Sequence, residues 1–350
     1  MLESFANFLQ NTGFYALISS GGIDAVKTII MIAIACVLLY LAIVKKFEPL
    51  LLLPIAFGML LSNLPMIKDS SAIMMHTEFF TNPEYMTDGK YINVGYICQH
   101  GGLLDLLYLG VKLGIYPPLI FVGIGCMTDF GPLIANPKSI LLGAAAQFGV
   151  FFTFVGALVL SALVPSINFG IKEAASIGII GGADGPTAIY VTKSLAPALL
   201  PAIAVAAYSY MALIPVIQPP IMKLMTRKKD RMIVMEQLRP VSKTEKILFP
   251  IIVTIIVALI IPDAVSLVGC LMLGNLMKES GVVERLTKMA QNELMNIITL
   301  FLGVTVGATA TASSFLSAQT IGIIVLGLIA FCFSTVGGLF LGDIMCWVTK

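Results

Sequence analysis

Long apolar runs recur along the whole chain, as in proteins that cross a bilayer with helices. About 20 apolar residues span a hydrocarbon core of about 30 Å. Only 11% of the residues are charged, against about 25% in soluble domains, and a transmembrane barrel would show short alternating segments instead. The sequence therefore predicts an all-α polytopic membrane protein. We expect its apolar segments at about 26–44, 47–64, 103–127, 138–164, 171–195, 198–225, 247–262, 263–277, 294–316 and 319–348.

Polar stretches between these segments predict how the chain is oriented. Residues 226–246 carry seven Lys or Arg against three acids, which places this loop in the cytoplasm. Lys45 and Lys46 mark a second cytoplasmic turn, so residues 65–101 are expected outside. Residues 1–25 lack the basic start and cleavage site of a signal peptide, and their apolar residues recur at helical spacing. We interpret them as an interfacial amphipathic helix.

One apolar segment cannot be a simple span. From the outside loop to the basic inside loop the chain must cross an odd number of times, yet four apolar segments lie between them. The weakest is 171–195, which begins with Lys172 and Glu173 and contains "GGADGPT". Gly and Pro in such density cannot hold a continuous helix. We therefore expect this segment to be broken or re-entrant, lining a cavity or buried in protein.

A weak internal repeat divides the chain. "FVGIGCMTDF" from Phe121 aligns with "FLGVTVGATA" from Phe301 at an offset of 180, and "FTFVGAL" (152–158) matches "FSTVGGL" (333–339) at 181. Internal repeats are typical of secondary transporters, in which two inverted halves meet at a site of discontinuous helices. We expect an N-terminal membrane repeat over 26–225 and a C-terminal one over 247–350, joined by the basic loop. A counterpart of "GGADGPT" would begin near position 362, so the second repeat is expected to be truncated.

An aspartate at membrane depth is costly and marks a functional site. Asp184 is flanked by Gly181, Gly182 and Gly185, which let backbone carbonyls approach an ion closely. Sodium is a hard cation that prefers such oxygen ligands, and the hydroxyl of Thr187 is a plausible further ligand. The alternative is a loop outside the bilayer in which Asp184 only caps the following helix.

Other polar residues in apolar surroundings are weaker candidates. Asp129 and Asn136, in "MTDFGPLIANP", belong either to a second ion site or to an ordinary cytoplasmic turn. Tyr208 and Tyr210 lie in an apolar segment that prolines interrupt, where a buried phenol needs a hydrogen-bond partner. The Thr- and Ser-rich tract 305–319 either packs helices closely or lines a path.

Several classes of function have no support in the residues. The six cysteines form no CxxC pair, and the two histidines lie 24 apart, which gives no metal-ligand spacing. Neither a Walker motif, a Rossmann glycine fingerprint, GxSxG nor HExxH occurs. A net charge of +2, with basic residues at membrane edges, indicates no nucleic-acid partner.

Three stretches resemble a known family. "GGADGPTAIY", "MTDFGPLIANP" and "LLDLLYLGVKLGIYPPLIFVGIG" (103–125) are similar to the β subunit of the sodium-ion-translocating, biotin-dependent decarboxylases. The family comprises the oxaloacetate, methylmalonyl-CoA, glutaconyl-CoA and malonate decarboxylase pumps, and the likeness runs from about residue 25 to the end. Asp184 and Tyr210 match the family's functional aspartate and tyrosine. The family's second Gly-rich motif would lie beyond Lys350.

The resemblance implies an enzyme subunit of the inner (cytoplasmic) membrane. It would decarboxylate carboxybiotin, take up a proton and move sodium outward. Asp184 would bind sodium, and Tyr210 would lie in the sodium and proton path. Implied partners are a biotin carrier and carboxyltransferase subunit, a small single-span membrane subunit and further copies of the chain. Biotin would be carried by the partner, because no AMKM-type attachment sequence occurs here.

Two other functions fit the residues. A sodium-coupled secondary transporter of an organic anion would use the same repeats without decarboxylation, and would work as this chain alone. A purely structural membrane subunit would tolerate the loss of Asp184.

Overall fold

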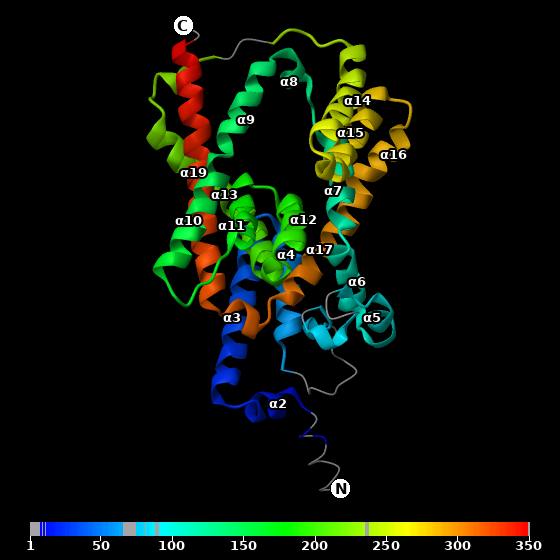
Figure 1. Ribbon diagram of the computed structural model, residues 1–350, viewed down its shortest axis with the longest axis vertical. Coiled ribbons are helices and arrows are strands. Elements are labelled where there is room, and N and C mark those ends of the chain that lie inside the picture. The colour runs from blue at the N-terminus through cyan, green and yellow to red at the C-terminus, as the bar shows by residue number, and fades with distance from the viewer. Residues whose placement is uncertain are drawn as a thin grey trace.

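The computed structural model describes residues 8, 10, 12–65, 75–80, 82–87, 91–234 and 238–348. Within these residues the chain is a bundle of helices that cross near its centre (Figure 1). One small antiparallel sheet pairs Met86 with Ile92 and Thr87 with Tyr91. The all-α polytopic membrane fold predicted from the sequence is confirmed.

The helices vary from one turn to more than eight. The long α-helices are α3 (Gly22–Ile43), α4 (Pro49–Asn63), α7 (Tyr116–Met127), α10 (Phe148–Leu163), α12 (Gly185–Leu195), α13 (Leu200–Met225), α14 (Lys243–Ile260), α15 (Val265–Ser280), α17 (Met295–Thr309) and α19 (Ala318–Val348). The shorter ones are α2 (Gly13–Ser19), α5 (Val94–His100), α6 (Leu103–Lys112), α8 (Gly131–Ala135), α9 (Ile140–Ala146), α11 (Ile171–Gly178), α16 (Glu284–Met289) and α18 (Ala312–Phe315). The remaining elements are β1 (Met86–Thr87), β2 (Tyr91–Ile92), the π-helical η8 (Ala290–Leu294) and the 3-10 turns η1 (Thr77–Phe80), η2 (Pro83–Tyr85), η3 (Pro137–Ser139), η4 (Ile179–Gly182), η5 (Pro197–Leu199), η6 (Asp230–Met232) and η7 (Pro262–Ala264).

Four continuous stretches of the described chain are long and apolar enough to cross a membrane, and two bent stretches raise the number to six. The second bent stretch runs from η5 through α13 and turns by 61° between Met211 and Leu213. Pro215 explains this bend. Proline has no backbone N–H, so the helical hydrogen bond to the carbonyl of residue 211 is missing. The continuous stretches are Gly22–Ile43, Pro137–Leu163, Glu284–Thr309 and Ala318–Val348, and the other bent one joins Leu103–Lys112 to Tyr116–Met127 at 70°.

The predicted break in 171–195 is confirmed. The helix α11 ends at Gly178, η4 follows, and α12 begins at Gly185. Neither helix alone approaches the length of about 20 residues that a span requires. Figure 1 shows this segment near the middle of the bundle rather than at either end.

A second break interrupts the segment predicted over 294–316, so that prediction is wrong at its C-terminal end. The helix α17 ends at Thr309, and α18 and α19 follow as separate helices. The hydroxyl of Ser314 donates to the carbonyls of Thr309 and Thr311, each at 3.2 Å. Side chains that bond nearby carbonyls in this way compete with helical hydrogen bonds, which explains a break without Gly or Pro.

Two helix pairs pack with their backbones almost in contact. In the pair α4–α17, a Cβ atom on Gly58 would lie 2.1 Å from the Val304 carbonyl oxygen, and one on Gly307 would lie 2.0 Å from that of Ile55. The core sits beside this pair, where the fully buried Tyr208 packs. Glycine is required at both positions because any side chain would force the helices apart.

The pair α7–α15 repeats this arrangement. A Cβ atom on Gly274 would lie 2.0 Å from the Val122 carbonyl oxygen, and one on Gly125 would lie 1.9 Å from that of Leu271. The contact of Gly274 with Val122 is equivalent to that of Gly58 with Val304. The contact of Gly125 with Leu271 is equivalent to that of Gly307 with Ile55. The shift in number is 216 from α4 to α15 and 182 from α7 to α17. Between α7 and α17 the register is therefore two residues from the offset of 180 that aligning Phe121 with Phe301 gives.

The two pairs run in opposite directions. The Cys126 carbonyl, at the end of α7, accepts a hydrogen bond of 2.6 Å from Gln291, just before α17 begins. Figure 1 shows α7 running toward α8 and α17 running away from it. Within each pair the helices are parallel, since Asn63 at the end of α4 donates to Ala310 at the end of α17. The contacts therefore agree with inverted repeats.

The same symmetry appears where the two repeated helices end. The Ala310 carbonyl, at the C-cap of α17, accepts from Asn63 Nδ2 at 2.8 Å. The Thr128 carbonyl, at the C-cap of α7, accepts from Lys278 Nζ at 2.9 Å and Asn275 Nδ2 at 3.1 Å. Terminal carbonyls of a helix lack intrahelical partners, so in each pair the neighbouring helix supplies one.

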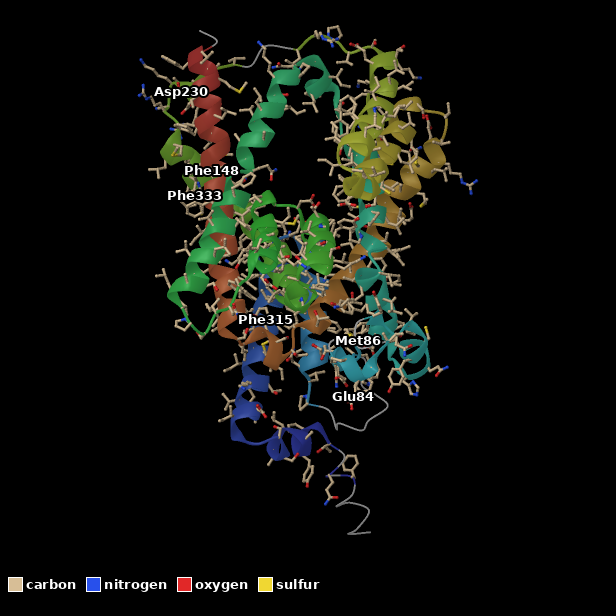
Figure 2. The ribbon with its side chains drawn as sticks, viewed as in Figure 1. Glu84, Met86, Phe148, Asp230, Phe315 and Phe333 are labelled. Carbon is tan, nitrogen blue, oxygen red and sulfur yellow. The ribbon has the colours of Figure 1, made fainter. Side chains whose placement is uncertain are left out.

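The two long polar loops lie on opposite sides of the bundle centre. Figure 2 shows Glu84 and Met86, in the loop predicted outside, in the lower half of the view and Asp230, in the basic loop, near the top. At the N-terminus, α2 and α3 replace the single interfacial helix expected over 1–25, and residues 1–7 lie outside the described residues.

Candidate functional site

A sharp turn between η4 and α12 positions Asp184. Ala183 has φ of 54°, in the left-handed region, and Asp184 is extended with φ of −126° and ψ of 98°. Pro186 occupies the first turn of α12, where a missing N–H costs nothing. The turn therefore starts a new helix and leaves the Asp184 carboxylate at its N-terminus. We call residues 179–187 the Asp184 hairpin.

Thr187 supplies both hydrogen bonds to the carboxylate. Its N–H donates to Asp184 Oδ1 at 3.2 Å, and its hydroxyl donates to Oδ2 at 2.5 Å. Asp184 is half-buried and caps α12, as in the alternative drawn from the sequence. An ionised carboxylate has about four acceptor positions, and the helix N-terminus favours the negative charge. Lone pairs of both oxygens therefore remain for a cation.

Two of the three predicted glycines make close packing contacts. A Cβ atom on Gly181 would lie 2.7 Å from the backbone carbon of Gly149 on α10, and one on Gly185 would lie 2.4 Å from the ring of Tyr208. At Gly182 the nearest side chain is Gln147, at 3.7 Å. Gly181 and Gly185 thus seat the hairpin against α10 and α13, and Gly182 faces more open space.

The two tyrosines of α13 differ in their surroundings. Tyr210 donates its hydroxyl proton to the Ile324 carbonyl of α19 at 2.5 Å, and its ring lies against Gly327. Tyr208 packs on Gly185 of the hairpin, and its buried hydroxyl has no hydrogen-bond partner among the described residues. Sequence reasoning gave the role to Tyr210 through the resemblance and missed that Tyr208 is the tyrosine in contact with Gly185.

Asp129 and Asn136 do not join the Asp184 hairpin. Both are exposed, in the turn region around α8. Asp129 accepts from the Gly131 N–H at 2.9 Å and lies 3.7 Å from Lys246 Nζ of α14. The hydrogen bond from Gly131, with the charges of Lys246 and Lys278, holds the pKa of Asp129 below its ordinary value. This geometry is that of a turn stabilised by its own backbone and a surface ion pair.

A cation at the hairpin would rely on few charges. Among the described residues, no three His, Cys, Asp or Glu side chains gather as they would around a divalent metal. Asp184 would contribute one negative charge, and backbone and hydroxyl oxygens would supply the other contacts. Such a donor set suits a hard cation of low charge and not a transition metal.

The similarity of this chain to known proteins covers nearly its whole length. Residues 27–350 match the family described as the Na+-transporting oxaloacetate decarboxylase beta subunit. Methylmalonyl-CoA decarboxylase subunit beta of Propionigenium modestum is 55% identical over 350 residues, which cover all of this chain and 84% of the relative. Glutaconyl-CoA decarboxylase subunit beta of Acidaminococcus fermentans is 50% identical over 98% of this chain and 80% of its own. The oxaloacetate decarboxylase beta chain of Klebsiella pneumoniae is 50% identical over 90% of this chain and 79% of its own.

Proposed function

Because this chain belongs to the Na+-transporting oxaloacetate decarboxylase beta subunit family, we propose that it decarboxylates carboxybiotin and uses the reaction to move sodium ions outward. Carboxybiotin is the substrate, presented by a partner. The reaction releases CO2 and consumes one proton, which restores the N–H of biotin. Sodium is the transported ion.

One observation assigns the proposed sodium binding to particular residues. Asp184 stands at a helix break near the middle of the bundle, half-buried, with lone pairs left over after Thr187 has donated twice. A carboxylate at membrane depth with lone pairs left over offers both charge and oxygen ligands to a hard cation such as sodium. We assign sodium binding to Asp184, the hydroxyl of Thr187 and the backbone of Gly181, Gly182 and Gly185. Asp129 and Asn136, which are exposed near α8, are proposed as further oxygen ligands for sodium at the surface.

Membership of this family supports a proposal about the assembly. The relatives are named as subunits of decarboxylases, and we propose that the partners here are a biotin carrier and carboxyltransferase subunit, a small single-span membrane subunit and further copies of this chain. The separation of the polar loops to opposite sides of the bundle centre (Figure 2) supports a cytoplasmic position for the basic loop 226–246 in the inner membrane. The carrier would then approach from that side.

Reconstitution of the complex in proteoliposomes tests the function. We expect decarboxylation of carboxybiotin to require sodium, with potassium as the control cation, and labelled sodium to move in the same experiment. Without the biotin carrier neither process should occur. Sodium-coupled uptake of an organic anion by this subunit alone would instead establish the secondary-transporter function.

Removal of the Tyr210 hydroxyl tests its place in the proton path. We expect Tyr210→Phe to lower sodium-dependent decarboxylation by at least about tenfold, because a positioned proton donor contributes at least this much. Tyr190→Phe is the matched control, since the Tyr190 phenol also contacts a backbone carbonyl, that of Asp263, and the rate should stay unchanged. Equal rates for wild type and Tyr210→Phe would limit Tyr210 to packing against α19.

A further inference from the structure

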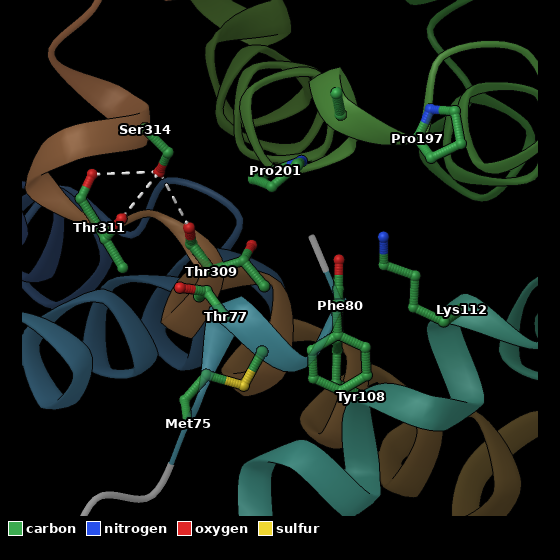
Figure 3. Close-up of a pocket in the computed structure, with 11 residues that line it drawn as sticks. Met75, Thr77, Phe80, Tyr108, Lys112, Pro197, Pro201, Thr309, Thr311 and Ser314 are labelled. Atoms are coloured by element: carbon green, nitrogen blue, oxygen red, sulfur yellow. Dashed lines mark hydrogen bonds between the residues drawn. The ribbon is translucent and has the colours of Figure 1, made fainter. Parts of the chain in front are cut away.

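A cavity of about 220 Å³ lies away from the Asp184 hairpin. Figure 3 shows its walls, which include Tyr108 and Lys112 of α6, Phe80 of η1, Pro201 of α13 and Ser314 of α18. It therefore opens where the second helix break, after α17, meets the segment predicted outside. Its described lining contains no residue of the hairpin.

Lys112 is the charged group of this cavity. Its side chain belongs to a residue only 9% exposed, and Nζ lies 5.7 Å from the centre of the Tyr108 ring. Among the described residues, Lys112 makes no ion pair and no side-chain hydrogen bond. A buried ammonium without an anion is unfavourable, and one aromatic face compensates only partly. An anion bound in the cavity would supply the missing counter-charge to Lys112.

The nearest acid on the same helix is already committed. Asp105, two turns before Lys112 on α6, is fully buried and accepts from the His76 N–H at 2.7 Å, the His76 ring at 2.7 Å and the Gly102 N–H at 2.8 Å. These bonds fix the chain beside Met75, which lines the cavity. Asp105 thus shapes the wall of the cavity and does not neutralise Lys112.

The rest of the lining favours a small anion with one charged end. The Ser314 hydroxyl donates to backbone carbonyls of its own turn, so the ammonium is the strong donor that faces the cavity. Two aromatic rings and two prolines share the remaining wall with three threonines, Thr77, Thr309 and Thr311. An ammonium binds a carboxylate through charge-assisted hydrogen bonds, and apolar walls accommodate a short carbon chain.

We propose that this cavity binds a small monocarboxylate, with its carboxylate group on Lys112. The site is distinct from the sodium site and does not depend on the proposed decarboxylation. Because it lies beside the break after α17, occupancy would hold α6, α13 and α18 together.

Thermal unfolding of the complete complex with acetate as the probe tests the site. In phosphatidylcholine nanodiscs, sodium acetate replaces sodium chloride at constant sodium concentration. We expect the midpoint to rise with acetate and to saturate with a dissociation constant on the order of 1–10 mM. Lys112→Met should weaken acetate binding at least about tenfold. Lys172→Met, which removes an exposed lysine, should respond as wild type does.

The wild-type titration alone can overturn the proposal, even if Lys112→Met does not fold. If the unfolding midpoint is the same in acetate as in chloride, no carboxylate binds Lys112. An acetate response that persists in folded Lys112→Met would show the same. Repeating the titration with phosphatidylserine in the nanodisc identifies the source of the carboxylate. If this lipid alone removes the acetate response, a lipid headgroup occupies the site in the membrane.

Discussion

Asp184→Asn is expected to abolish sodium-dependent decarboxylation, by at least about a hundredfold, while the subunit remains folded. Asn caps helices about as well as Asp, so Thr187 keeps an acceptor for its N–H. The substitution removes the one negative charge of the hairpin, and a neutral amide binds sodium far more weakly than a carboxylate does. Initial rates at increasing sodium concentration, with the thermal midpoint of the same sample, measure both effects.

Two further variants separate the charge from the cap. Asp184→Ala should lose activity and also about 1 kcal/mol of stability, because the N-cap acceptor is gone. Asp263→Asn removes an exposed carboxylate at another helix start and should leave the rate unchanged. Sodium-stimulated decarboxylation that persists in Asp184→Asn would contradict the assignment of sodium to Asp184 and would favour a structural role.

The break that forms the candidate site could be predicted because its cause is local. Gly181, Gly182, Gly185 and Pro186 disfavour a helix through their own backbone properties, and counting membrane crossings selected the same segment. The break after α17 contains no Gly or Pro, and its Thr- and Ser-rich sequence is equally compatible with close helix packing. It depends on hydroxyl bonds within its own turn and on Asn63, which lies on α4 and serves the Ala310 carbonyl. A contact between residues 247 positions apart leaves no mark in a local pattern.

The side chains around the Asp184 hairpin and around the Lys112 cavity were harder to predict for a related reason. Tyr208 and Tyr210 are equivalent in the sequence, two residues apart in one apolar segment, and only the packing of α13 against the hairpin and α19 distinguishes them. Lys112 reads as an ordinary basic residue at the end of a helix. It is buried beside a cavity that α13 and α18 also line, and these helices are distant from α6 in the sequence.

The glycine contacts of the inverted repeat give the second large expected effect, on stability. A Cβ atom on Gly307 would lie 2.0 Å from the Ile55 carbonyl oxygen, which is backbone and cannot swing away. We expect Gly307→Ala to lower the free energy of unfolding by about 3 kcal/mol, because overpacking forces α17 away from α4. Gly125→Ala should have a similar effect, since its contact with Leu271 is the equivalent one. Thermal unfolding in detergent measures both.

Gly143→Ala is the matched control for these variants. Gly143 lies in α9 and is exposed, and a Cβ atom there would have no neighbour within 4 Å. The substitution should raise stability by up to about 1 kcal/mol, because alanine loses less backbone entropy in a helix than glycine does. Whether a glycine-to-alanine substitution raises or lowers stability thus depends on the neighbouring helix and not on glycine itself. If Gly307→Ala raised the unfolding midpoint as Gly143→Ala does, α4 and α17 would not approach as closely as the two inverted pairs require.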